Sequence, residues 1–277
     1  MKKTLIALAV AASAAVSGSA MAWTQGGVNG SVDISGTITA DTYSDKWEWM
    51  VGSGLSFQNT TKDMAEGNKI LTITQEQPAP ILLGRTTEAF SASMVGVGAI
   101  PLISFSDYAG KPVNLQSADE AAKGYFDLPM KDAEEHELGR VKVNVTVAGL
   151  LTQGDASSGL VNLYSVESSD NSNIYYGGLV SSVVGRGSEA STITAKFGNY
   201  GHNELLRQVQ GVLPNCNKGQ VNYYTLKTDM VQKNNNVLAS SYSLGIDQGQ
   251  TIEATFDAPV VKTTQWAAPL NVAVTYN

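Results

Sequence analysis

The sequence contains few of the residues that build metal centres, disulfide frameworks or nucleic-acid interfaces. Its 277 residues include one cysteine and two histidines. A single cysteine excludes an internal disulfide. The low number of cysteines and histidines excludes a Cys- or His-rich metal site. We therefore expect neither a metal nor another cofactor. Only 16% of residues are charged, 18 basic against 25 acidic, and no basic block occurs. Because phosphate contact requires clustered Lys and Arg, we expect no nucleic-acid partner.

Motifs of common hydrolases and nucleotide-binding enzymes are also missing. The sequence has no G-x-S-x-G, no H-E-x-x-H and no P-loop. His136 lies in a charged, loop-like stretch, and His202 comes at the start of a helix-like one. Glu134 and Glu135 are adjacent, and neighbours in a chain seldom face each other across a substrate. We therefore expect no enzymatic activity.

The first 22 residues have the pattern of an export signal. Lys2 and Lys3 precede an apolar run over 5–16, and Ala20 and Ala22 form an A-x-A cleavage pattern. The run is shorter than the roughly 18–20 residues that span a bilayer. The sequence therefore predicts a signal peptide at 1–22 and an exported chain. Its single thiol, Cys216, is then an incidental loop residue or a site for an intermolecular bridge.

Most of the chain alternates apolar and polar residues, as half-buried β-strands do. The clearest case is Arg140 to Val147, with four valines on one face. Turn-forming clusters such as 52–54, 66–68 and 234–236 separate the segments. Many short strands at such spacing predict an all-β sandwich or barrel. Further strands are predicted around 32–38, 47–51, 71–73, 102–105, 161–164, 179–184, 237–246, 251–256 and 270–276.

Two segments have a helical pattern instead. His202 to Gln210 places Leu205, Leu206 and Val209 on one face, with Gly211 and Pro214 after it. Ser117 to Lys123 has a Ser–Glu capping box. We therefore expect one short helix at each place.

Both ends of the exported chain alternate with a strict period of two. The N-terminal end is Gly-rich and then carries Val32, Ile34, Gly36 and Ile38. Such a segment can add itself to a neighbour's open sheet edge, or it can be the first strand of its own sheet. The C-terminal end carries Leu270, Val272, Val274 and Tyr276, and an exposed edge of this kind invites pairing unless it is covered.

Several blocks of sequence resemble one family over much of the chain. The blocks are Asn29–Ile34, Lys46–Trp49, Leu71–Thr74, Ile81–Arg85, Tyr175–Leu179, Gly249–Phe256 and Gln265–Tyr276. They resemble the FaeG family of major fimbrial subunits and adhesins, from chaperone–usher pili of enterotoxigenic Escherichia coli. Within that family, the sequence is most similar to the subunit of a capsule-like surface antigen. Residues 155–173 and 188–236 match least well.

The resemblance implies an immunoglobulin-like sandwich over 41–277 that lacks one strand. The N-terminal extension, 23–40, would supply that strand, Val28–Ala40, to a neighbouring copy by donor-strand exchange. Its groove-filling side chains would be Val32, Ile34 and Ile38, with Gly36 where the two backbones approach most closely. The groove would be lined partly by Leu270, Val272, Val274 and Tyr276.

Partners and location also follow from the resemblance. The last strand would pair with a periplasmic pilus chaperone, and an outer-membrane usher would pass the subunit to a surface fimbria built of copies of itself. The family also carries a receptor-binding region within the sandwich, which corresponds to about 163–217 here. Side chains suited to a host-cell glycan in this region are Tyr164, Asp170, Asn171, Asn173, Tyr175, Tyr176, Arg186 and Tyr200.

Two alternatives remain open on the sequence. A purely structural shaft subunit, with no receptor of its own, would have the same strands and ends. An outer-membrane β-barrel is also exported and rich in strands, but its strands need about ten alternating positions. The runs here are mostly four to eight residues long, and a helical segment interrupts them.

Overall fold

The alternating segments form strands over nearly the whole of the described chain. The computed structural model describes residue 36 and residues 42–277, and residues 42–277 belong to one compact unit. The predicted signal peptide and the predicted donor-strand residues Val32, Ile34 and Ile38 lie outside the described residues. Gly36 is described without its neighbours, so the structure gives no account of the extension 23–40.

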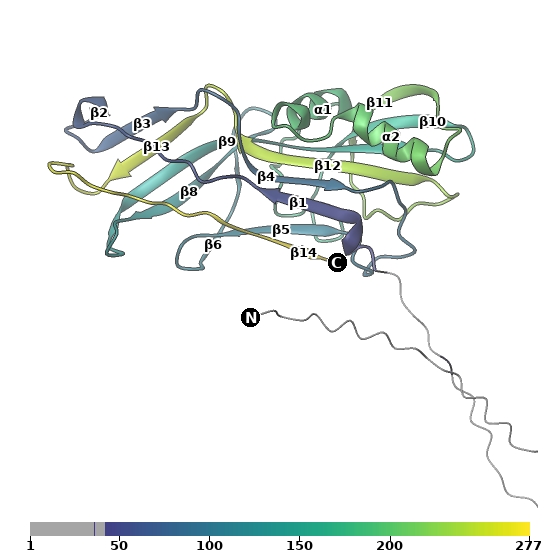
Figure 1. The fold of residues 1–277 in the computed structure, drawn as a ribbon, viewed down its shortest axis with the longest axis horizontal. Coiled ribbons are helices and arrows are strands. Elements are labelled where there is room, and N and C mark those ends of the chain that lie inside the picture. Colours follow the sequence, from purple (N-terminus) through teal and green to yellow (C-terminus); the bar gives the residue numbers. More distant parts are fainter. Residues whose placement is uncertain (1–35, 37–41) are drawn as a thin grey trace, which may run out of the picture. The chain divides into compact units, whose positions relative to one another are not determined.

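The all-β prediction is confirmed, because strands dominate residues 42–277 (Figure 1). The long strands are β4 (Ala79–Thr86), β8 (Lys123–Lys131), β9 (Glu137–Gly154), β11 (Lys218–Leu226) and β12 (Val237–Ile246). The shorter strands are β1 (Trp47–Val51), β2 (Met64–Ala65), β3 (Ile70–Thr74), β5 (Pro101–Ser106), β6 (Pro112–Val113), β7 (Gln116–Ser117), β10 (Leu160–Val166), β13 (Thr251–Phe256) and β14 (Asn271–Tyr276). Two α-helices, α1 (Gly187–Lys196) and α2 (His202–Val212), and two 3-10 turns, Ser44–Lys46 and Thr61–Asp63, complete the elements of this part of the chain.

The strands form two sheets around a shared core. The larger sheet follows the order β1-β4-β12-β9-β13-β3-β2, with β8, β7, β10 and β11 branching from β9, and the smaller sheet has the order β14-β5-β6. The 18-residue β9 pairs with β8 and β10 along one edge and with β13 and β12 along the other. Phe105 of the small sheet packs on Phe126 of the large one, with ring centroids 4.8 Å apart. The two sheets therefore enclose one apolar interior, as a sandwich does.

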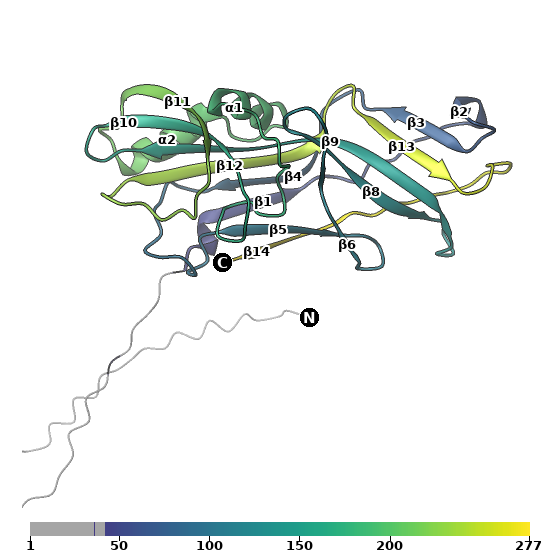
Figure 2. The ribbon, with the colours of Figure 1, turned by 180° about the vertical axis from the view of Figure 1, so that it is seen from behind.

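The two helices cover the outer face of the large sheet where β9, β10 and β12 lie (Figures 1 and 2). Leu205 and Val209 of α2 are fully buried there, which confirms the predicted helix at His202. Cys216 is buried in the same apolar cluster and not in an open loop. Its burial raises the pKa of the thiol and keeps it from solvent, which does not favour the intermolecular bridge that the sequence left open as one of two alternatives.

Two local predictions are wrong. Residues 117–123 form no helix, because β7 ends at Ser117 and the chain turns into β8, with Ala122 in the left-handed region at φ 61°. Residues 179–184 form no strand. Instead, Ser181 donates two hydrogen bonds to the hydroxyl of Ser117, and the carbonyl of Ser182 accepts one from the N–H of Ala122.

Helix α1 is absent from the sequence-based expectations. Its buried positions are Gly187, Ala190, Ser191 and Thr194. These residues are small or polar, so they follow the helical period without producing an apolar stripe. No helix among the described residues is long and apolar enough to span a membrane.

Candidate functional site

The candidate site lies where β1 and β14, the outer strands of the two sheets, leave their far edges unpaired. In the described part of the chain, β1 pairs only with β4 and β14 pairs only with β5. The alternation of Trp47, Glu48 and Trp49 turns both indoles toward the core, and Trp47 is buried. The free edge of β1 continues into Met50 and Val51, both of which are exposed.

Trp49 connects the two free edges. Its indole lies over Gly84 of β4, where an added Cβ would be 2.3 Å from the ring. Only glycine leaves room for the indole there. The Nε1 of Trp49 donates a hydrogen bond of 2.9 Å to the hydroxyl of Tyr276 on β14. The edges of the two sheets therefore meet side chain to side chain at this point.

The inward face of β14 is only half covered. Val272, Val274 and Tyr276 alternate with exposed residues and pack against the core, yet each keeps part of its surface in solvent. Leu270 has the same half-buried position just before the strand. Partial burial raises the pKa of the Tyr276 hydroxyl, which the Trp49 bond partly offsets. Apolar side chains on a free edge are suited to contact with a further strand.

The core behind these edges is buried and aromatic. Tyr175 and Tyr242 are fully buried with ring centroids 5.0 Å apart, and Tyr175 lies edge-on to both Trp47 and Trp49. The hydroxyl of Tyr242 donates to the carbonyl of Gly178 at 2.6 Å. Because water is excluded, the pKa of both tyrosines lies well above the ordinary value.

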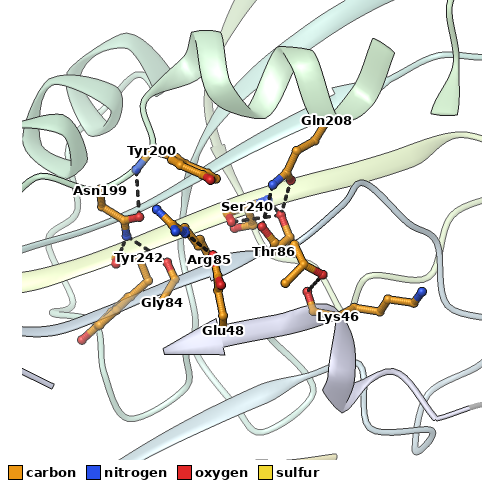
Figure 3. Close-up of polar contacts among 11 residues, drawn as sticks. Lys46, Glu48, Gly84, Arg85, Thr86, Asn199, Tyr200, Gln208, Ser240 and Tyr242 are labelled. Carbon is orange, nitrogen blue, oxygen red and sulfur yellow. Dashed lines mark hydrogen bonds and ion pairs between the residues drawn. The ribbon is translucent and has the colours of Figure 1, made fainter. Parts of the chain in front are cut away.

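The helical region holds β4 and β12 from the opposite face (Figure 3). The buried amide of Asn199 donates to the carbonyls of Gly84 and Tyr242 at 3.0 and 2.8 Å. The side chain of Gln208 on α2 exchanges hydrogen bonds with Thr86. Arg85 lies 3.9 Å from the ring centre of Tyr200 and pairs with Glu48 of β1. These contacts fix the strand next to β1 and therefore fix the position of the free edge.

The predicted glycan-binding residues do not gather at one place. Tyr175 is completely buried and cannot offer its ring to a sugar, so it leaves the set. Tyr200 lies under Arg85, and Asn173 is buried, where its carbonyl accepts hydrogen bonds from Ser169. The exposed members are spread over the residues on both sides of Tyr175 and the segment before α1: Asp170, Asn171, Tyr176 and Arg186.

A different group of residues surrounds Arg186. Together with Asn222, Tyr223 and Tyr224 of β11 it lines a surface hollow of about 260 Å³. Tyr164 of β10 stacks on Tyr223 with a centroid distance of 5.0 Å. The sequence prediction includes Arg186 and Tyr164 but misses the three β11 residues. The sequence signal that could have identified them is the Tyr-Tyr pair in a polar, strand-like stretch, which lies just beyond residue 217, the predicted end of the receptor-binding region.

A cluster of ligand-type atoms also lies at the turn between β8 and β9. Asp132, Glu134 and His136 place their oxygens and nitrogens within 4.8 Å of one another. The Oδ1 of Asp132 accepts the backbone N–H groups of Glu134 and His136, and His136 Nδ1 lies 3.2 Å from the other oxygen. These hydrogen bonds account for the cluster as a turn structure.

Comparison with known proteins agrees with the resemblance seen in the sequence. The chain matches the family model described as "Fimbrial, major and minor subunit" over residues 1–277. It is 48% identical to the K88 fimbrial proteins AB and AC of Escherichia coli, and each match covers the full length of this chain and of the relative. The F41 fimbrial protein of the same organism is 30% identical over its full length. The chain therefore belongs to the family of fimbrial major and minor subunits that contains the K88 fimbrial proteins.

Proposed function

We propose that this chain is the major subunit of a surface fimbria or capsule-like antigen and polymerises by donor-strand exchange. The extension 23–40 of one copy would lie between β1 and β14 of the next copy and pair with their free edges. The observation that carries the proposal is the meeting of two unpaired edges at Trp49 and Tyr276. A periplasmic chaperone would cover the same edges before assembly, and an outer-membrane usher would direct the exchange.

The energetics favour such a joint without any catalytic group. Val32, Ile34 and Ile38 would leave water together with the half-buried side chains of β14. Each fully buried aliphatic side chain contributes on the order of 1.5–3 kcal/mol before ordering costs. A ladder of main-chain hydrogen bonds along both edges would add specificity of register.

The role of the extension can be tested with two variants that place the same charge on opposite faces of the predicted donor strand. Ile34→Asp places a charge among the groove-filling side chains, whereas Ser35→Asp places the same charge on the opposite face of the strand. We expect Ile34→Asp to abolish fibres while the chaperone-bound subunit persists, and Ser35→Asp to polymerise. Electron microscopy of expressing cells and a heat-sensitive multimer ladder report the result. Fibres of normal length from Ile34→Asp would show that the donor-strand assignment is wrong.

A second function, binding of a host glycan, is favoured by the hollow beside β11. Tyr224 is 73% exposed, Tyr223 is stacked on Tyr164, and Arg186 and Asn222 provide hydrogen-bond donors at the rim. Sugars stack their apolar face on aromatic rings and use such polar groups for their hydroxyls. We propose that a glycan binds here, at a site that keeps Arg186 and Tyr164 of the residues predicted from the sequence and adds three residues of β11.

Glycan binding can be tested on purified fimbriae. Tyr224→Ala removes the exposed ring of the hollow, and Tyr176→Ala removes an exposed ring outside it. We expect a glycan array to lose its signal with Tyr224→Ala and to keep it with Tyr176→Ala. No ligand for the unmodified fimbria, alongside a binding control subunit, would favour the purely structural shaft subunit.

A further inference from the structure

An exposed apolar loop lies where the extension joins the body. Met94 and Val95 are 61% and 45% exposed, in the loop that leads to β5. The carbonyl of Val97 in this loop accepts the N–H of Tyr43 at 3.1 Å, close to residue 42, where the described body begins. The N–H of Ile100 donates to the carbonyl of Asn277, and the N–H of Asn277 donates to the carbonyl of Ile100. The C-terminal end of β14 therefore lies next to the same loop. We call this the joining end.

The most exposed large apolar side chain of the described residues lies at the opposite end. Val261 is 84% exposed, in the connection between β13 and β14. Neighbouring Val260 is anchored, because it exchanges hydrogen bonds with Asn68. Figure 1 shows this yellow connection far from the C label, which lies near the start of β1. We call this the far end.

The chain between Val261 and the C-terminus has the length of a donor strand. From Thr264 to Tyr276 every second residue is half-buried, and Ala267 exchanges hydrogen bonds with Lys131 of β8. Thr264–Tyr276 and the predicted donor strand Val28–Ala40 each contain 13 residues. At about 3.3 Å per residue both span roughly 40 Å.

The short linker limits how far apart two copies can be. Between Ala40 at the end of the donor strand and Tyr43 in the body lie only two residues, which span at most about 10 Å. The joining end of one copy must therefore touch the end of its neighbour at which Ala40 lies. β14 runs from the far end to the joining end, so a donor strand parallel to it would place Ala40 at the neighbour's joining end, and each copy would then contact both of its neighbours there. An antiparallel donor strand places Ala40 at the neighbour's far end, so the two neighbours of a copy lie at its opposite ends, as a growing fibre requires.

We propose that Met94 and Val95 of one copy pack against Val261 of the next copy, in a head-to-tail contact beside the inserted strand. The proposal rests on donor-strand exchange and adds a second contact to it, between surfaces that the extension does not form. Its occupant is a second copy of this chain. The contact would cover the exposed apolar side chains at both ends and limit bending at the joint.

Cysteine cross-linking on assembled fimbriae tests the contact directly. Purified fimbriae of the double variant Val95→Cys, Val261→Cys are treated with a mild oxidant and boiled in detergent without reductant. The control is Val212→Cys, Val261→Cys, because Val212 is also 45% exposed but lies at the end of α2. Cys216 is buried and stays unchanged in both. We expect boiling-resistant multimers from the first variant and monomers from the second.

The outcomes separate this contact from the exchange itself. Fibres of the Val95/Val261 variant that yield only monomers overturn the contact and leave donor-strand exchange intact. Equal cross-linking in the Val212 control also overturns it, because the disulfides would then report random collision. Failure of the unmodified chain to form fibres at all would overturn donor-strand exchange, and the contact with it.

Discussion

β12 and β14 are alternating strands of the same molecule with opposite surroundings. All ten residues of β12 are buried, because β4 and β9 pair with its edges, the helices cover one face and the aromatic core covers the other. β14 pairs along one edge only, and none of its residues is fully buried. Both edges of β12 are paired within the chain, whereas β14 leaves one edge unpaired among the described residues. In the proposed exchange, this unpaired edge is the one that a neighbouring copy completes.

The largest loss of stability is expected from removing a side chain of β12. Tyr242→Ala deletes a fully buried ring and should destabilise the subunit by about 3–5 kcal/mol, in the free and the polymerised state alike. Urea unfolding followed by circular dichroism measures it. Tyr242→Phe, which loses only the hydroxyl bond to Gly178, should cost far less. A cost that differed between free subunit and fibre would mean that β12 also changes on assembly.

The second prediction concerns the glycine under Trp49. Gly84→Ala brings a methyl group to 2.3 Å from the indole and should cost about 1–3 kcal/mol as Trp49 is displaced. Exchange with a donor-strand peptide should slow, since the edge that receives it has moved. Gly211→Ala is the matched control, because no atom lies within 4 Å of its added Cβ. Unchanged exchange in Gly84→Ala would show that Trp49 does not position the edge.

The third prediction addresses β14 itself. Val274→Ala removes a half-buried side chain, so we expect a loss of about 1 kcal/mol or less in the free subunit and a larger loss in the fibre. Ala273→Ser, on the exposed face of the same strand, should change neither. Urea midpoints of free subunit and fibre give the comparison. Equal losses in both states would mean that no strand covers Val274 on assembly.

The smallest effect is expected at the turn between β9 and β10. Ser157 and Ser158 donate hydrogen bonds to Asp155 and lower the pKa of its carboxyl to about 2. The folded pKa is depressed, so this contribution is present above pH about 4 and is lost as pH falls toward about 2. Asp155→Asn should remove most of the change in the free energy of unfolding between pH about 4 and about 2, and Ser157→Ala should remove part of it. Urea unfolding at a series of pH values measures this change. If the free energy of unfolding falls with pH as steeply in both variants as in the unmodified chain, the assignment to Asp155 is wrong.

Much of the fold could be predicted because strand alternation and sheet burial have the same period. β12 and β13 have the predicted bounds, and α2 follows from its apolar face. Helix α1 could not be predicted in this way, since it packs through glycine, alanine, serine and threonine. The helix expected at 117–123 fails because a capping pattern cannot outweigh the pairing of β7 with β8.

The candidate site was predictable to a lesser extent. The alternation of Val272, Val274 and Tyr276 marks a strand with one apolar face, but it does not show which edge remains free. That depends on the pairing of β14 with β5, about 170 residues away in sequence. Tyr175 illustrates the opposite failure, because a residue type suited to sugar binding is equally suited to a core.

The positions of the tryptophans give the molecule an optical property. Of its four tryptophans, Trp47, Trp49 and Trp266 lie in the described residues. All three pack against the core, Trp47 and Trp49 from β1 and Trp266 from the segment that leads to β14. Trp49 and Trp266 are half-buried and would lose solvent when a strand is added, whereas Trp47 is buried already. The fluorescence of the described tryptophans therefore reports on β1 and on the segment that leads to β14. If the proposed exchange adds a strand there, a blue shift in emission follows it in real time, without a label.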